Sequence, residues 1–126
     1  YISAGHELPL LIRPGEGIVE INGNGRFIGM IENLELKEFE VTIKTGDRML
    51  IFSDGVPDAT NMDGVQYGYD RLKRFLNRQQ GVAIQQMIDL LAADIAAWTG
   101  NAPPFDDLTL LGVEVLDGHG EVSTSY

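Results

Sequence analysis

Apolar residues in the first half of the chain recur as they do in β-strands. Residues 9–13 and 18–21 are short apolar runs on either side of a Gly-Glu-Gly turn, which predicts a β-hairpin. Residues 34–43 alternate apolar and charged side chains, with a slip of one position at Lys37-Glu38, which predicts a further strand with a bulge or a change of register. Residues 49–52 are apolar without alternation, as in a strand that is buried on both faces. This half is therefore predicted to form a sheet.

The second half changes to helical spacing after Gly68. A first helix is predicted from Leu72, Phe75 and Leu76, and Gln-Gln-Gly at 79–81 ends it. A second, longer helix is predicted from apolar residues that recur every three or four positions: Ile84, Met87, Ile88, Leu91, Ile95 and Trp98. Residues 108–116 then predict a closing strand. Strands, two helices and a last strand indicate an α+β fold, an antiparallel sheet with helices on one face.

Composition and charge exclude several classes of protein. The chain has 126 residues and a net charge of −10, which disfavours nucleic acid and anionic membranes as partners. It has no cysteine, so disulfides, zinc-thiolate sites and thiol nucleophiles are excluded, and a cytoplasmic location is expected. Residues 117–126 are expected to be a polar tail. The start at Tyr1 within a strand-like pattern is interpreted as a cut edge of a larger domain.

Carboxylates lie at the ends of two predicted buried strands. Asp54 follows the strand at 49–52, and Asp106 and Asp107 precede the strand at 108–116. Such carboxylates suit hydrated Mg²⁺ or Mn²⁺, which prefer oxygen ligands, and Gly55 would let the backbone turn beside an ion. Each motif has an ordinary alternative: Asp-Gly is usually a turn, and Asp-Asp is often a cap. The basic residues Arg71, Lys73, Arg74 and Arg78 could meet an acidic partner or form a solvated helix face.

Several segments, taken in order, resemble one known family. Residues 50–59 resemble the "(Y/F)(T/S)DGV-EA" segment of the sporulation and stress-response (SpoIIE-like) branch of the PP2C (PPM) serine/threonine protein phosphatases. Residues 106–111 match its "DD(I/M)T(L/V)(L/V)" segment. Four further segments are similar to "NAGHPP-LL", "G-PLG", "PGD" and "FG-ERL": residues 3–11, 25–29, 46–47 and 67–72. The resemblance covers residues 1–116, as the C-terminal part of a phosphatase domain.

The resemblance implies a fold and a chemistry. The fold is an αββα sandwich of antiparallel sheets, here partial, and the activity is removal of phosphate from phosphoserine or phosphothreonine by water activated at a pair of Mn²⁺ or Mg²⁺ ions. Asp54 and Asp106 match metal-binding aspartates, and Asp107 ranks second. His6 would have a structural or substrate-side role. The implied partners are a phosphorylated regulatory protein such as an anti-anti-sigma factor and a sensor or receiver domain upstream. Separately, strands left exposed by a missing half could pair with a second copy of the chain.

One family segment does not occur. Relatives of this type carry an earlier "D-SGHG" segment whose aspartate bridges both metals, and nothing like it precedes Asp54. The chain is therefore either a fragment, inactive by itself, or a non-catalytic phosphatase-like module that binds a signalling partner. A serine hydrolase that uses Ser53 and His6 is excluded, because Ile51 stands where a nucleophile elbow requires glycine.

Overall fold

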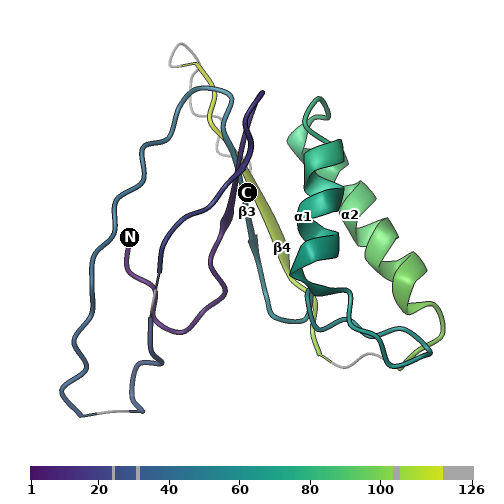
Figure 1. The fold of residues 1–126 in the computed structure, drawn as a ribbon, viewed down its shortest axis with the longest axis horizontal. Coiled ribbons are helices and arrows are strands. Elements are labelled where there is room, and N and C mark those ends of the chain that lie inside the picture. The colour runs from purple at the N-terminus through teal and green to yellow at the C-terminus, as the bar shows by residue number, and fades with distance from the viewer. Residues whose placement is uncertain (24, 31, 104–105, 118–126) are drawn as a thin grey trace, which may run out of the picture.

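A single antiparallel sheet carries two helices on one of its faces (Figure 1). The structure, a computed structural model, describes residues 1–117 apart from 24, 31, 104 and 105. The sheet has the strand order β2-β1-β3-β4, and every neighbouring pair is antiparallel. The elements are β1 (Leu10–Arg13), β2 (Gly17–Val19), β3 (Arg48–Phe52), α1 (Gly68–Arg78), α2 (Ile84–Thr99) and β4 (Leu110–Glu114). The predicted hairpin, both helices and the closing strand are therefore confirmed, with strand ends that differ by one or two residues.

The core lies between the sheet and the helices. Strand side chains alternate between the two faces, and Leu50 and Phe52 of β3 point toward the helices and are almost completely buried. Helix α1 packs over β2 and α2 packs over β4. Gly112 lets α2 come close, because a Cβ atom there would lie 2.7 Å from the side chain of Ile84. The buried residues of α1 and α2 all belong to the apolar positions predicted from helical spacing. The periodicity therefore identified the face of each helix that packs on the sheet.

The predicted strand at 34–43 is wrong. This segment is extended but forms only one isolated bridge, between Ile2 and Glu38. It runs apart from the sheet (Figure 1), and Phe39, Val41 and Ile43 line a cavity of about 690 Å³ whose opposite wall includes Met49 and Ile51. Alternation predicted the apolar face correctly, but a strand also needs a neighbour that offers backbone hydrogen bonds along its length. Residues 1–3 offer this segment only a short neighbour, with a single bridge between Ile2 and Glu38.

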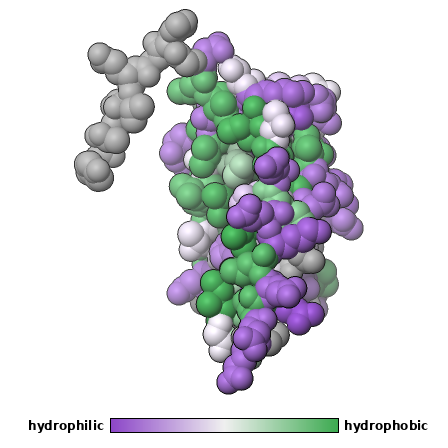
Figure 2. Space-filling model, turned by 90° about the vertical axis from the view of Figure 1, so that its left-hand side faces the viewer, coloured by the Kyte–Doolittle hydropathy of each residue, from purple (hydrophilic) through white to green (hydrophobic). Residues whose placement is uncertain are grey.

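The sheet face opposite the helices is apolar and partly exposed. Leu111 and Val113 of β4 are 53% and 44% exposed, and Ile43, in the segment across the cavity from β3, is 52% exposed. Figure 2 views the molecule from this side and shows apolar residues gathered down much of its length. A soluble monomer rarely exposes a contiguous apolar patch of large size.

In the described part of the chain, no helix is long and apolar enough to cross a membrane.

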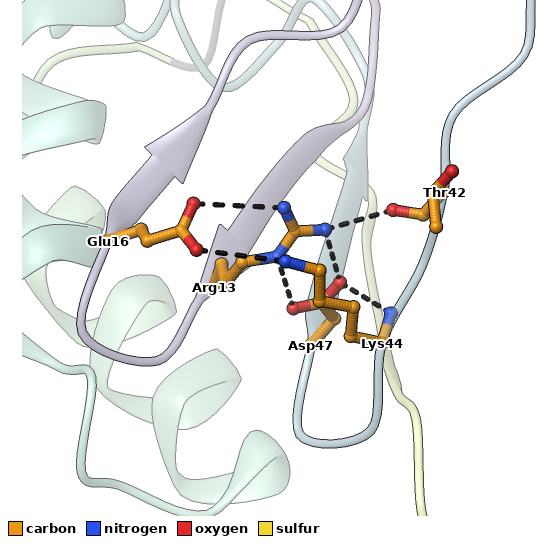
Figure 3. Close-up of polar contacts among 5 residues, drawn as sticks. All are labelled: Arg13, Glu16, Thr42, Lys44 and Asp47. Atoms are coloured by element: carbon orange, nitrogen blue, oxygen red, sulfur yellow. Dashed lines mark hydrogen bonds and ion pairs between the residues drawn. The ribbon is translucent and has the colours of Figure 1, made fainter.

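A buried ion pair joins the β1–β2 hairpin to the turn before β3 (Figure 3). Asp47 is fully buried, and its two carboxylate oxygens accept hydrogen bonds from Nε and Nη2 of Arg13 at 3.0 and 2.9 Å. The backbone N–H of Lys44 donates to the same carboxylate at 2.8 Å, and Arg13 also donates to the carbonyl oxygen of Thr42 at 2.9 Å. The hydrogen bond from Arg13, with the one from Lys44, lowers the pKa of Asp47. Asp47 of the family-like Gly46-Asp47 segment therefore has a structural role: it holds the β1–β2 hairpin against the turn before β3.

The predicted boundary between a domain at 1–116 and a polar tail at 117–126 stays a prediction. All but Asp117 of that tail lies outside the described residues.

Candidate metal-binding edge of the sheet

Pairing of β3 with β4 brings the Asp-Gly and Asp-Asp segments to one edge of the sheet. Phe52, the last residue of β3, is opposite Leu110, the first residue of β4. The pairing continues by one hydrogen bond, from the N–H of Ser53 to the carbonyl oxygen of Thr109 at 3.2 Å. Because the strands are antiparallel, the exit of β3 and the entry of β4 are neighbours. The sequence predicted two strand ends with carboxylates, and the structure places them side by side.

Ser53 connects the two segments with its side chain. Its hydroxyl donates to the carbonyl oxygen of Asp107 at 3.0 Å and accepts from the N–H of Thr109 at 3.0 Å. Both bonds use backbone groups of the residues that lead into β4. The hydroxyl of Ser53 therefore holds the edge together. Ser53 was predicted to be a strand residue and not a nucleophile; it lies directly after β3, and its lack of a nucleophilic role stays a prediction.

Gly55 lies where the two segments touch. It is buried in the turn that follows Asp54, and a Cβ atom at this position would lie 2.4 Å from the carbonyl oxygen of Asp107. That distance is far below a normal contact, so any side chain would push the two segments apart. The expected sharp turn is present, and close backbone approach is an additional reason for glycine.

We expect Gly55→Ala to lower the free energy of unfolding by about 1–3 kcal/mol, because overpacking at a rigid contact forces the backbone to move. Calorimetry of the full-length protein measures the change. Gly81→Ala is the matched control, since no atom lies within 4 Å of its Cβ position and alanine there restricts the unfolded chain. Equal melting temperatures for the two variants would contradict the close contact at Gly55.

The three predicted carboxylates are exposed at this edge. Asp54, Asp106 and Asp107 all have exposed side chains. The N–H of Asp107 donates to Oδ1 of Asp106 at 2.7 Å, which orients the Asp106 carboxylate. Asp106 and Gly55 also line a cavity of about 220 Å³ beside α2. Among the described residues, no group of three or more histidine, aspartate and glutamate side chains is close enough to hold a metal ion.

Glu7, in the N-terminal segment beside His6, lies within electrostatic reach of Asp54 at this edge. His6 is exposed, and its Nδ1 lies 3.0 Å from the carbonyl oxygen of Glu7. Partial burial raises the pKa of Glu7, and the negative charges of Asp54 and Asp58 raise it further, whereas His6 lowers it. Glu7 therefore lies within electrostatic reach of Asp54. Sequence reasoning missed Glu7; its only signal was its position directly after His6.

The basic residues of α1 are partly engaged within the chain. Nε of Arg71 lies 3.4 Å from Oδ2 of Asp94 on α2, and Nζ of Lys73 lies 3.0 Å from Oε1 of Glu20. These two side chains therefore pair within the chain, and the choice between a solvated helix face and a face that meets an acidic partner stays a prediction.

Solved structures with the same fold are PP2C phosphatase domains. The chain superposes on the SiaA-PP2C domain of Pseudomonas aeruginosa with a TM-score of 0.73 at 23% identity, covering 84% of this chain and 42% of that one. It superposes on the phosphatase domain of the cell fate determinant SpoIIE from Bacillus subtilis, in a crystal form without domain swapping, with a TM-score of 0.68 at 20% identity, covering 99% and 53%. The predicted PP2C-like α+β fold is confirmed, as part of such a domain.

The sequence model of the family described as Stage II sporulation protein E (SpoIIE) matches residues 1–116. The chain belongs to this family. Protein IcfG of Synechocystis is 29% identical over 114 residues, which are 90% of this chain and 18% of that protein. The chain thus spans about half or less of the relatives and solved structures that it matches.

Proposed function

We propose that this chain is part of a metal-dependent protein phosphatase that removes phosphate from phosphoserine or phosphothreonine of a regulatory protein, such as an anti-anti-sigma factor. The observation that carries the proposal is the common edge of β3 and β4. There Ser53 fixes the segment of Asp54 beside that of Asp106 and Asp107, within a chain of the SpoIIE family.

The donor set fits hard divalent cations. Exposed carboxylates at one edge provide the oxygen ligands that Mn²⁺ and Mg²⁺ prefer, while water completes their coordination. Asp54 and Asp106 would hold the metal, Asp107 is the second choice beside Asp106, and the backbone at Gly55 lets the segments approach. The metal, when bound, would supply Lewis-acid activation of water and of the phosphoryl group. One SpoIIE structure was obtained from crystals presoaked with Mn, which supports this choice of ion.

This chain's residues hold the edge rigid and orient the carboxylates. Ser53 ties the exit of β3 to the entry of β4. The N–H of Asp107 fixes the carboxylate of Asp106. Because the family segment "D-SGHG", whose aspartate bridges both metals, does not precede Asp54, we propose that further donors come from polypeptide outside this chain.

The partners follow from the same proposal. One solved SpoIIE structure contains a fragment of a regulatory domain besides the PP2C domain, which supports a sensor or receiver domain in the same polypeptide. Cytoplasmic location, exclusion of nucleic acid and self-association through exposed strand edges stay predictions. The net charge of −10 supports the exclusion of nucleic acid as a partner.

We expect the full-length protein to release phosphate from a phosphoserine protein substrate in the presence of Mn²⁺ and to stop when a chelator is added. The isolated 126-residue chain is expected to release none, because it supplies only part of the ligand set. Phosphate release is measured directly, with the chelated protein reloaded with Mn²⁺ as the control. Binding of a phosphorylated partner without any turnover by the full-length protein would favour the non-catalytic alternative. Turnover by the isolated chain would refute the incomplete site.

A further inference from the structure

The loop between β3 and α1 carries Asp54 as its second residue and is closed by backbone hydrogen bonds. The N–H of Asp58 donates to the carbonyl oxygen of Asp54 at 3.0 Å, the N–H of Gly68 to that of Pro57 at 2.9 Å, and the N–H of Tyr67 to that of Ala59 at 2.7 Å. The conformation at Asp54 is therefore tied, through this loop, to the position of Tyr67 at the start of α1.

Four side chains fix that end of the loop to α2. The hydroxyl of Tyr67 donates to Oδ2 of Asp94 at 2.7 Å, and Trp98 donates from Nε1 to the carbonyl oxygen of Val65 at 3.2 Å. The guanidinium of Arg71 lies 4.3 Å from the ring centroid of Trp98 and 5.2 Å from that of Tyr67, and it also pairs with Asp94. We call Tyr67, Arg71, Asp94 and Trp98 the loop clamp.

The polar bonds of the clamp specify geometry more than they add stability. The two helices already pack on the sheet through Leu72, Leu76, Met87 and Leu91, which are completely buried. A partly desolvated ion pair contributes little net stability, because the cost of removing water offsets the attraction between the charges. Directional bonds from Tyr67 and Trp98 hold both ends of the segment 65–67 in one place, and that segment carries the hydrogen bond back to Ala59.

We propose that Tyr67 and Trp98 are positioning residues for Asp54: the loop clamp holds the β3–α1 loop in the conformation that binds the metal ion. The inference rests on the proposed role of Asp54 as a metal ligand. Without the clamp, the loop occupies additional conformations, and the apparent affinity for the metal falls by the fraction that is no longer competent to bind. The chemistry at the loaded site is then unchanged.

The test uses Tyr67→Phe and Trp98→Phe in the full-length protein. Tyr67→Phe keeps the ring and removes only the hydroxyl, and Trp98→Phe removes the N–H to Val65 while keeping an aromatic ring. Binding of Mn²⁺ is measured from the loss of the free-ion electron paramagnetic resonance signal. We expect the dissociation constant for Mn²⁺ to rise in Tyr67→Phe, by up to about tenfold, because the loss of one hydrogen bond to a charged group can lower the competent fraction by no more than that. Hydrogen exchange of the amides of Asp58 and Tyr67 in the metal-free protein is expected to accelerate.

Lys73→Gln is the control. It removes a charge of α1 that pairs with Glu20 and lies outside the clamp, so Mn²⁺ affinity and exchange should match the wild type. A purely structural role would lower the melting temperature of Tyr67→Phe and Trp98→Phe without changing Mn²⁺ affinity, and that result would overturn the inference. Absence of Mn²⁺ binding by the wild type, or its persistence in Asp54→Asn, would instead overturn the proposed function on which the inference rests.

Discussion

Asp54→Asn in the full-length protein is expected to lower phosphatase turnover by more than about 100-fold, because loss of a residue that only supports a metal ligand already costs about 10- to 100-fold. The amide removes the negative charge and one strong oxygen donor, while Ser53 and Gly55 still hold the edge in place. Asp106→Asn should have an effect of the same order. Asp107→Asn should have a smaller one, because Asp107 contributes its backbone to the edge through Ser53.

Initial rates of phosphate release at saturating Mn²⁺ measure these effects. Asp63→Asn is the matched control, because Asp63 is an exposed carboxylate in the same loop and undergoes the same change of charge. Its rate should remain within about twofold of the wild type. Near-wild-type rates for Asp54→Asn with saturating Mn²⁺ would refute the assignment of this carboxylate as a ligand.

Asp47→Ala is expected to lower the free energy of unfolding by about 2–3 kcal/mol, because it leaves Arg13 without its bidentate partner. The estimate lies below the cost of orphaning a fully buried charge, since the Arg13 side chain is 13% exposed and still donates to Thr42. Glu16→Ala is the control: its side chain is 59% exposed and lies 3.7 Å from Arg13, and such pairs contribute about 1 kcal/mol or less. Calorimetry of the full-length protein gives both values. Equal losses of unfolding free energy in the two variants would contradict a stabilising role for the buried Arg13–Asp47 ion pair.

Asp47 also makes the stability of the folded protein depend on pH, with a definite sign. Its pKa in the folded protein lies below the ordinary value of 3.8. The stability that Asp47 contributes is therefore fully present above pH 3.8 and is lost as the pH falls through the lower, folded pKa. Asp47→Asn should remove this part of the acid sensitivity.

Periodicity predicted the elements that bury a face against the core. The two helices follow directly from helical spacing, and the strands at 49–52 and 108–116 follow from short apolar runs. The segment at 34–43 alternates almost as clearly, apart from a slip at Lys37-Glu38, and forms no strand. The pattern reports which side is apolar, whereas a strand also depends on a hydrogen-bonding neighbour that is distant in sequence.

The sequence could predict which residues belong to the candidate site, but not how they lie relative to one another. Asp54 and Asp106 could be identified as strand-end carboxylates, and their adjacency required the pairing of β3 with β4. The contribution of Ser53 is a single hydroxyl that bridges two segments, and no periodicity marks it. The roles of Tyr67 and Trp98 were not predicted: Trp98 was expected only on the apolar face of the second helix, and Tyr67 only within a family-like segment. Their polar atoms meet partners on another helix and on a loop.

Binding of Mn²⁺ to the full-length protein tests the central claim most directly. The account predicts saturable binding by the wild type and an affinity reduced by more than about 100-fold in both Asp54→Asn and Asp106→Asn, since each removes a direct ligand. Asp63→Asn should bind as the wild type does. Unchanged Mn²⁺ binding in both ligand variants would contradict the account, because the common edge of β3 and β4 would then not be the metal site.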